Sequence, residues 1–183
     1  MTISDSVFKG LRWAAFGRLA TALITWCITF FVIRLLAPED YGLLNMGMVV
    51  IALTAVVGEF GLQAALIRLE SVTTEILRKA FGIILLSYLG LALIIVLMTP
   101  LVAAFYQEER LNQILPVLTI PVILSAFHQI PYTLVMRQMN YKPGALISVG
   151  AALVGSLGTL TVALLDGGVW ALIAGQIIIA AVT

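Results

Sequence analysis

Long runs of apolar residues, separated by short clusters of charged and polar residues, are the dominant pattern along this chain. Dividing the sequence at the charged clusters leaves apolar stretches at residues 13–36, 43–66, 81–105, 111–136, 144–165 and 168–183. A helix rises about 1.5 Å per residue, so about 20 apolar residues cross the ~30 Å hydrocarbon core of a bilayer. The pattern therefore predicts a polytopic transmembrane helical bundle with about six spans.

The fold class predicted from these runs is all-α. Membrane strands need segments of about ten residues with alternating polarity, and these runs lack that alternation. Residues 1–183 form a single predicted transmembrane domain, because no long polar region divides them. The last stretch, 168–183, is short and has no stop signal, capping glycine or charged tail. We therefore expect the chain to be part of a longer protein.

Composition agrees with a lipid environment. Of the 183 residues, 62% are hydrophobic and 10% are charged, whereas soluble domains have roughly 45–50% and about 25%. Ten basic and nine acidic residues give a net charge of +1, which argues against a polybasic nucleic-acid binder. The single cysteine, Cys27, cannot form an internal disulfide, and its apolar surroundings indicate a buried, inert thiol.

The distribution of basic residues predicts the orientation. With a cytoplasmic N-terminus, the outer side holds Arg34 and Arg110, and Arg18 falls within the first span. The inner side then holds seven basic residues: Lys9, Arg12, Arg68, Arg78, Lys79, Arg137 and Lys142. Cytoplasmic loops carry an excess of Lys and Arg, so we expect a multi-pass protein with its N-terminus in the cytoplasm.

Local signals mark several helix boundaries and one irregular helix. Asp40 can cap the helix that follows Pro38, and Thr73 or Thr74 can open the third long helix. Each proline within a helix removes a backbone donor, so a proline-rich span is expected to be kinked or partly unwound. The fourth stretch contains three of them: Pro116, Pro121 and Pro131.

Enzyme motifs are missing from the sequence. It contains no glycine loop ending in Gly-Lys-Ser/Thr, no G-x-S-x-G, no H-E-x-x-H and no C-x-x-C. The glycine cluster Gly155-Ser156-Leu157-Gly158 lies in an apolar span and favours close helix packing. We therefore predict no catalytic residue, no metal site and no cofactor.

Ionisable residues at membrane depth are costly and are the main functional candidates. Arg18 lies about five residues from the inner end of the first span, and Glu59 about seven from the inner end of the second. At 1.5 Å per residue both are ~8–10 Å inside the inner face. They can form a structural salt bridge between antiparallel spans, or they can line a polar cavity.

Two further ionisable residues lie along the spans. His128 lies between the prolines of the fourth stretch, where it is either a hydrogen-bonded core residue or a ligand or proton-coupling group. Arg34, near the outer end of the first span, can extend to lipid headgroups or pair with Glu39 or Asp40.

Four segments together resemble the N-terminal part of bacterial polysaccharide flippases, the Wzx-type branch of the multidrug/oligosaccharidyl-lipid/polysaccharide exporter superfamily. The most specific are Leu-Ala-Pro-Glu-Asp-Tyr-Gly at 36–42 and Glu-Phe-Gly-Leu at 59–62. The others run from Lys9 to Leu19 and from Pro131 to Lys142. The resemblance covers nearly the whole chain and implies half of a larger two-lobed transporter that works by alternating access.

The resemblance also implies a cargo and a location. The cargo is an undecaprenyl-pyrophosphate-linked oligosaccharide, moved across the bacterial inner membrane for exopolysaccharide, capsule or O-antigen synthesis. The implied partners are membrane lipid and this lipid-linked oligosaccharide, with a polysaccharide polymerase and the export machinery as further candidates and no nucleic acid. A diphosphate requires Arg or Lys in a cavity. The candidate substrate-binding residues are Arg18 first, then Arg34 and Arg137, with Glu59, Gln63 and His128.

Other functions stay open at this point. A cation-coupled multidrug exporter of the same superfamily would favour carboxylates within the membrane, and only Glu59 qualifies. A membrane-embedded polyprenyl-phosphate sugar transferase or polymerase would need catalytic loops with carboxylates or histidines, but the loops are short. A scaffold protein of the membrane is a further alternative.

The orientation predicts the accessibility of the segment from Leu69 to Lys79. In a Cys27→Ser background, Thr73→Cys should resist a membrane-impermeant thiol reagent added to intact cells and react once the cells are opened. Glu109→Cys, on the predicted outer side, is the control that should react in intact cells. Labelling of position 73 from outside would contradict the orientation.

Overall fold

The computed structural model describes residues 3–58, 73–137 and 141–183, and every regular element among them is an α-helix, as predicted. The helices are α1 (Ile3–Val32), α2 (Pro38–Gly58), α4 (Thr74–Tyr106), α5 (Leu111–Arg137), α6 (Tyr141–Leu164) and α7 (Val169–Val182). Within these residues, four stretches are long and apolar enough to cross a membrane: Ala15–Val32, Thr74–Tyr106, Leu111–Val135 and Lys142–Leu164. The apolar helix α7 is shorter, and the predicted stretch 43–66 extends beyond the described residues.

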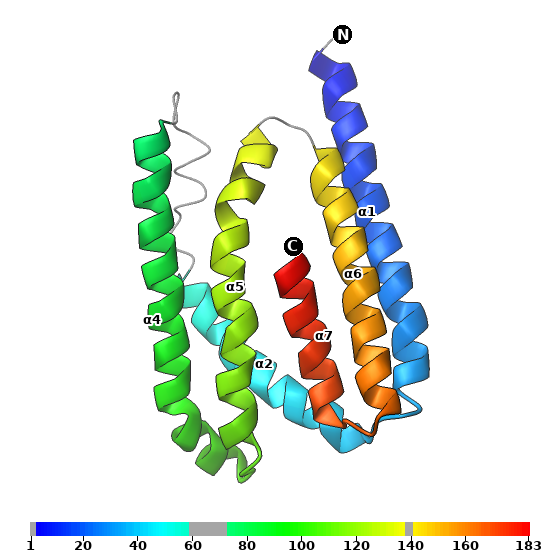
Figure 1. Cartoon of the computed structure of the whole chain (residues 1–183), viewed down its shortest axis with the longest axis vertical. Helices are drawn as coiled ribbons and strands as arrows, with labels where there is room; N and C mark the ends of the chain where they lie inside the picture. The colour runs from blue at the N-terminus through cyan, green and yellow to red at the C-terminus, as the bar shows by residue number, and fades with distance from the viewer. Residues whose placement is uncertain (1–2, 59–72, 138–140) are drawn as a thin grey trace.

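Among the described residues, the helices α4, α5, α7, α6 and α1 stand side by side in a row, which α2 crosses (Figure 1). Along the row α4 packs on α5, α5 on α7, α7 on α6 and α6 on α1. Helix α2 runs obliquely across one face of the row and packs against α4, α5 and α7. Among the described helices, α1 packs mainly against α6. Helices α1 and α2 follow each other in the sequence but are not close packing partners.

The largest core cluster lies where α2 meets α4, α5 and α7. Its buried members include Leu43, Ile95, Leu115 and Ile173, one from each of these helices. A second, smaller cluster joins the ends of α1, α6 and α7. In lipid, association of helices depends on close packing rather than on removal of apolar surface from water.

Glycines allow the closest approach, between α6 and α7. A Cβ added at Gly155 would stand 3.0 Å from Ile179 Cδ1 and 3.1 Å from the Gly175 carbonyl oxygen. A Cβ at Gly158 would overlap Ile178, and one at Gly175 would overlap Thr159. The prediction that the glycine cluster serves helix packing is therefore confirmed.

The predicted capping is confirmed at Thr73, whereas α2 begins at Pro38, so Asp40 lies in its first turn and not at its N-cap. The Thr73 hydroxyl accepts from the Ile76 amide at 3.4 Å at the start of α4. The Asp40 carboxylate accepts from the Ala37 amide at 3.2 Å. Asp40 also lies against Gly168, whose φ of 53° is in the left-handed region, and a Cβ there would stand 3.3 Å from Asp40 Oδ1. This contact joins the first turn of α2 to the α6–α7 connection.

Two local predictions need correction. Of the kink or partial unwinding predicted for the proline-rich span, the unwinding does not occur, because helix α5 continues without a break through Pro116, Pro121 and Pro131. Hydroxyls of this helix donate back to its own carbonyls, Thr119 to Pro116 at 2.6 Å and Ser125 to Pro121 at 2.8 Å, which keeps these side chains satisfied inside an apolar environment. Cys27 is exposed rather than buried, because it lies on a face of α1 that α6 does not cover.

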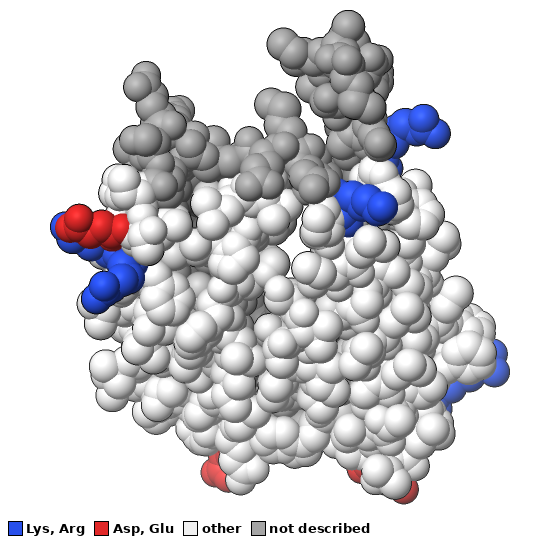
Figure 2. Space-filling view, turned by 45° about the horizontal axis from the view of Figure 1, so that its top comes forward, with Lys and Arg blue, Asp and Glu red and all other residues white. Residues whose placement is uncertain are grey.

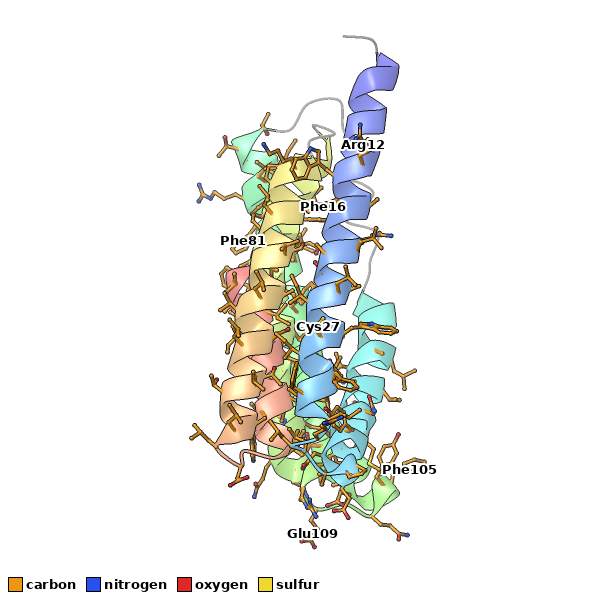
Figure 3. The ribbon with its side chains drawn as sticks, turned by 90° about the vertical axis from the view of Figure 1, so that its right-hand side faces the viewer. Arg12, Phe16, Cys27, Phe81, Phe105 and Glu109 are labelled. Carbon is orange, nitrogen blue, oxygen red and sulfur yellow. The ribbon has the colours of Figure 1, made fainter. Side chains whose placement is uncertain are left out.

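Charged residues are divided between the two ends of the bundle. One end of the bundle carries the N-terminus and the starts of α4 and α6. The basic residues at this end are Arg12 on α1, Arg78 and Lys79 on α4, and Lys142 on α6. Figure 3 shows Arg12 towards this end and Glu109 at the other. Most Lys and Arg atoms lie in the upper part of Figure 2, whereas Asp and Glu lie along its lower rim, apart from one acidic group beside Lys and Arg at the upper left. The charge separation expected from the sequence is therefore present in three dimensions.

The contact between α1 and α6 generates a stability prediction. A Cβ at Gly17 would stand 2.8 Å from Ala145 Cβ and 3.1 Å from Ala145 Cα, atoms that cannot rotate away. Gly17→Ala should therefore destabilise the protein by about 1–3 kcal/mol, the usual cost of overpacking. The thermal midpoint of the purified protein in detergent measures this change.

Gly90→Ala is the matched control, because nothing lies within 4 Å of a Cβ at that position of α4. Its midpoint should stay unchanged or rise, since Ala favours helix more than Gly does. Equal midpoints for Gly17→Ala and Gly90→Ala would show that the α1–α6 contact tolerates a methyl group.

Candidate functional site

The structure describes only some of the predicted site residues. Arg18 lies on α1 within a candidate span, is exposed, and makes no ion pair with a described residue. Glu59 and Gln63 lie outside the described residues, so the predicted Arg18–Glu59 pair stays a prediction. Arg137 is the last residue of α5, and its side chain also lies outside the description.

Arg34 and His128 have defined surroundings that differ from each other. The Arg34 guanidinium lies 5.1 Å from the centre of the Phe30 ring, a cation–π contact. Of its two expected interactions, the pair with Glu39 or Asp40 is not formed, and the extension to lipid headgroups stays a prediction. His128 Nδ1 lies 2.7 Å from the Thr183 carbonyl oxygen, which can only accept, so Nδ1 donates. The His128 ring also contacts Tyr132, with ring centres 5.2 Å apart. The two residues lie in different parts of the bundle.

A cavity of about 150 Å³ lies between α1, α2, α6 and α7. Its α1 residues come from the last two turns of that helix and its α2 residues from the first two turns, so it lies towards the end of the bundle away from the N-terminus. Its lining combines apolar side chains with hydroxyl and amide groups, and none of its residues is charged. The polar side chains are Thr25, Thr29, Tyr41, Ser156, Thr159 and Gln176.

Two hydroxyls in this region have no partner within the described part of the chain. Tyr41 Oη and Thr21 Oγ1 are both buried and make no hydrogen bond there. Tyr41 lies at the start of α2, before its apolar stretch and outside the four candidate spans. Burial raises the pKa of the Tyr41 hydroxyl and the Asp40 carboxylate raises it further, so the phenol stays protonated and can donate as well as accept.

The helix periodicity explains how this polar lining arises. Thr21, Thr25 and Thr29 recur every four residues along α1, and Arg18 precedes Thr25 by seven. Residues three, four and seven apart lie on one side of a helix. The four side chains therefore form a polar stripe on α1, which we call the Arg18–Thr29 stripe.

Of the Arg18–Thr29 stripe, the sequence predicted Arg18 as a site residue but not the three threonines, although their spacing in an apolar run was a detectable signal. Gln176 and Tyr41 could not be added to it from sequence, since they lie on helices that meet α1 only in the folded bundle. On α6, Thr159 Oγ1 donates to the Gly155 carbonyl at 3.1 Å, and Gly175 leaves room for it.

Basic and aromatic side chains meet at the end of the bundle that carries the N-terminus. The Lys142 ammonium lies 5.3 Å from the centre of the Trp13 ring and so links α6 to α1. Arg12, which precedes Trp13 in the sequence, is exposed. Among the described residues, no three His, Cys, Asp or Glu side chains lie together as a metal site.

Comparisons with known proteins agree with this membrane architecture. A family described as "Polysaccharide biosynthesis protein" matches residues 31–183. The chain is 23% identical over 171 residues to the protein named "Succinoglycan biosynthesis transport protein ExoT" of Rhizobium meliloti (strain 1021). That match covers 93% of this chain and 35% of the relative, so the chain spans about a third of the relative's length. No solved structure matches the chain.

Proposed function

Because this chain belongs to the polysaccharide biosynthesis protein family, we propose that it forms part of a flippase for a lipid-linked oligosaccharide. The cargo is a sugar unit attached through diphosphate to a polyprenyl lipid, and it moves from the cytoplasmic to the outer leaflet of the bacterial inner membrane. The product serves exopolysaccharide, capsule or O-antigen synthesis. The name of the matched relative, a succinoglycan biosynthesis transport protein, supports this class of cargo.

The observation that carries the proposal is the Arg18–Thr29 stripe within a candidate membrane span. An arginine at membrane depth is costly unless it faces a partner or a polar cavity. Arg18 makes no ion pair with a described residue, and the stripe leads from it to a hydroxyl-lined cavity. Arginine binds phosphate oxygens through paired, charge-assisted hydrogen bonds. In the proposal Arg18 binds the diphosphate while the lipid tail stays in the bilayer.

The positions of the carboxylates favour this cargo over the cations of a drug exporter. A cation-coupled drug exporter needs acidic groups within its spans to bind the ion or a basic drug. The carboxylates whose side chains the structure describes lie in connections or in the first turn of a helix: Glu39, Asp40, Glu75, Glu108, Glu109 and Asp166. The described part of the bundle therefore offers a neutral and cationic lining, which suits a diphosphate-linked sugar.

The proposed function predicts that Arg18, within α1, matters more for export of the lipid-linked sugar than Arg34, which lies just after the end of α1. Arg18→Ala should lower export of the lipid-linked sugar by about tenfold or more, since a hydrogen bond to a charged group contributes about 1.5–3 kcal/mol and 1.4 kcal/mol is a factor of ten. Arg34→Ala, which loses only the contact with Phe30, should export nearly normally. The measurement is the amount of cytoplasm-facing lipid-linked intermediate in cells that carry equal amounts of each protein.

Two further strains complete this experiment. Deletion of the gene should cause the intermediate to accumulate, and Arg18→Lys should restore part of the export because it retains the charge. Normal export by a well-expressed Arg18→Ala variant would exclude this residue from the cargo site. A deletion strain without any accumulated intermediate would overturn the proposed function itself.

A further inference from the structure

The cavity between α1, α2, α6 and α7 combines an apolar surface with many groups that both donate and accept hydrogen bonds. The hydroxyls of Thr25, Thr29 and Tyr41 and the amide of Gln176 approach it from three helices. Leaving such groups unpaired in an apolar environment costs free energy. The lining is therefore suited to a ligand that carries several hydroxyl groups, and poorly suited to a lipid chain.

The absence of charged side chains from the described lining further limits the class of ligand that the cavity can bind. No Lys or Arg lines the cavity, so it lacks the charge-assisted donors that a phosphate group requires. No carboxylate lines it either. The ligand that matches this lining is uncharged and polar.

The volume of the cavity limits the size of the ligand that it can bind. A protein cavity of about 150 Å³ accepts one benzene ring when its walls are apolar. The present cavity has a volume of about 150 Å³ and is partly open to one side. It can therefore take one six-membered ring whose substituents extend through the opening.

The most informative hydroxyl is that of Tyr41. Threonine and serine hydroxyls often bond to carbonyls of their own helix, as Thr159 does to Gly155 at 3.1 Å. The aromatic ring holds the Tyr41 hydroxyl away from its own backbone, and this buried hydroxyl has no partner among the described residues. It can therefore bond to a ligand without breaking a bond in the protein.

The position of Arg18 relates the cavity to the proposed cargo. Thr25 follows Arg18 by seven residues, which is two helical turns or ~10 Å along the same side of α1. A diphosphate held by the long Arg18 side chain would therefore have its attached sugars directed along the Arg18–Thr29 stripe towards the cavity.

We propose that this cavity is a subsite for one uncharged sugar ring of the cargo, held by Tyr41, Gln176, Thr25 and Thr29. The inference rests on the proposed function and adds a second binding point to it. Arg18 binds the diphosphate, and the cavity recognises a pyranose ring through hydroxyl-to-hydroxyl hydrogen bonds and apolar contact with the ring carbons.

The test measures protection of a cysteine by a free sugar. In the Cys27→Ser background, Thr29→Cys introduces a thiol into the cavity of the full-length protein, reconstituted in lipid nanodiscs. The probes are methyl α-glucopyranoside and methyl β-galactopyranoside, with glycerol at equal concentration as a control for solvent effects. At least one glycoside should slow alkylation of position 29 by N-ethylmaleimide, and glycerol should not.

Two variants make the test specific. Adding Tyr41→Phe, which preserves the ring and removes the hydroxyl, should raise the glycoside concentration needed for half protection about fivefold, as expected for one lost hydrogen bond. Thr161→Cys, at an exposed threonine of α6 outside the cavity, should show no protection. Equal protection of positions 29 and 161 would show a general solvent effect and overturn the subsite.

The outcomes separate the subsite from the proposed function. If gene deletion causes lipid-linked intermediate to accumulate but neither glycoside protects position 29, the subsite is overturned and the transporter function stands; the cavity then holds water only. If deletion causes no accumulation, the transporter function is overturned, and protection at position 29 alone decides whether the cavity takes a sugar ring.

Discussion

The absence of hydrogen-bonding solvent within a bilayer is the constraint on which the rest of this structure depends. Every polar group at membrane depth must find a partner in the protein or face a cavity. The back-bonded hydroxyls of α5 and the gathering of carboxylates at helix ends both follow from it. The same constraint makes the exceptions informative, since Arg18 and Tyr41 Oη have no hydrogen-bonding partner among the described residues.

Small residues decide where polar groups can gather. Gly17 brings α1 against Ala145 of α6, and Gly155 and Gly175 bring α6 against α7. Helices in lipid approach closely where side chains are absent. The cavity lies beside the α6–α7 contact, since Gly175 lines it, and its polar groups come from α1, α2, α6 and α7. Packing and the candidate binding surface are therefore two consequences of one pattern of glycines.

Arg18 and the uncharged cavity lie along one side of α1. This arrangement suits a cargo that has both a charged part and an uncharged part. A diphosphate-linked sugar has an anionic link, a neutral polyhydroxylated part and a lipid tail, and each part needs a different environment. Arg18, the hydroxyl-lined cavity and the surrounding bilayer provide these three environments in the proposal.

The sequence by itself determined the properties that depend on local composition. Hydropathy identified the long apolar helices, Thr73 and Asp40 marked helix starts, and the order of basic residues separated the two ends. Expectations based on single residues failed where the packing of neighbouring helices determines the outcome. Helix α5 stays helical through Pro121, and Cys27 is exposed because α6 covers only one side of α1. Only the tertiary structure brought Tyr41 and Gln176 to the threonines of α1, because that meeting depends on which helices pack together, and hydropathy carries no record of helix partners.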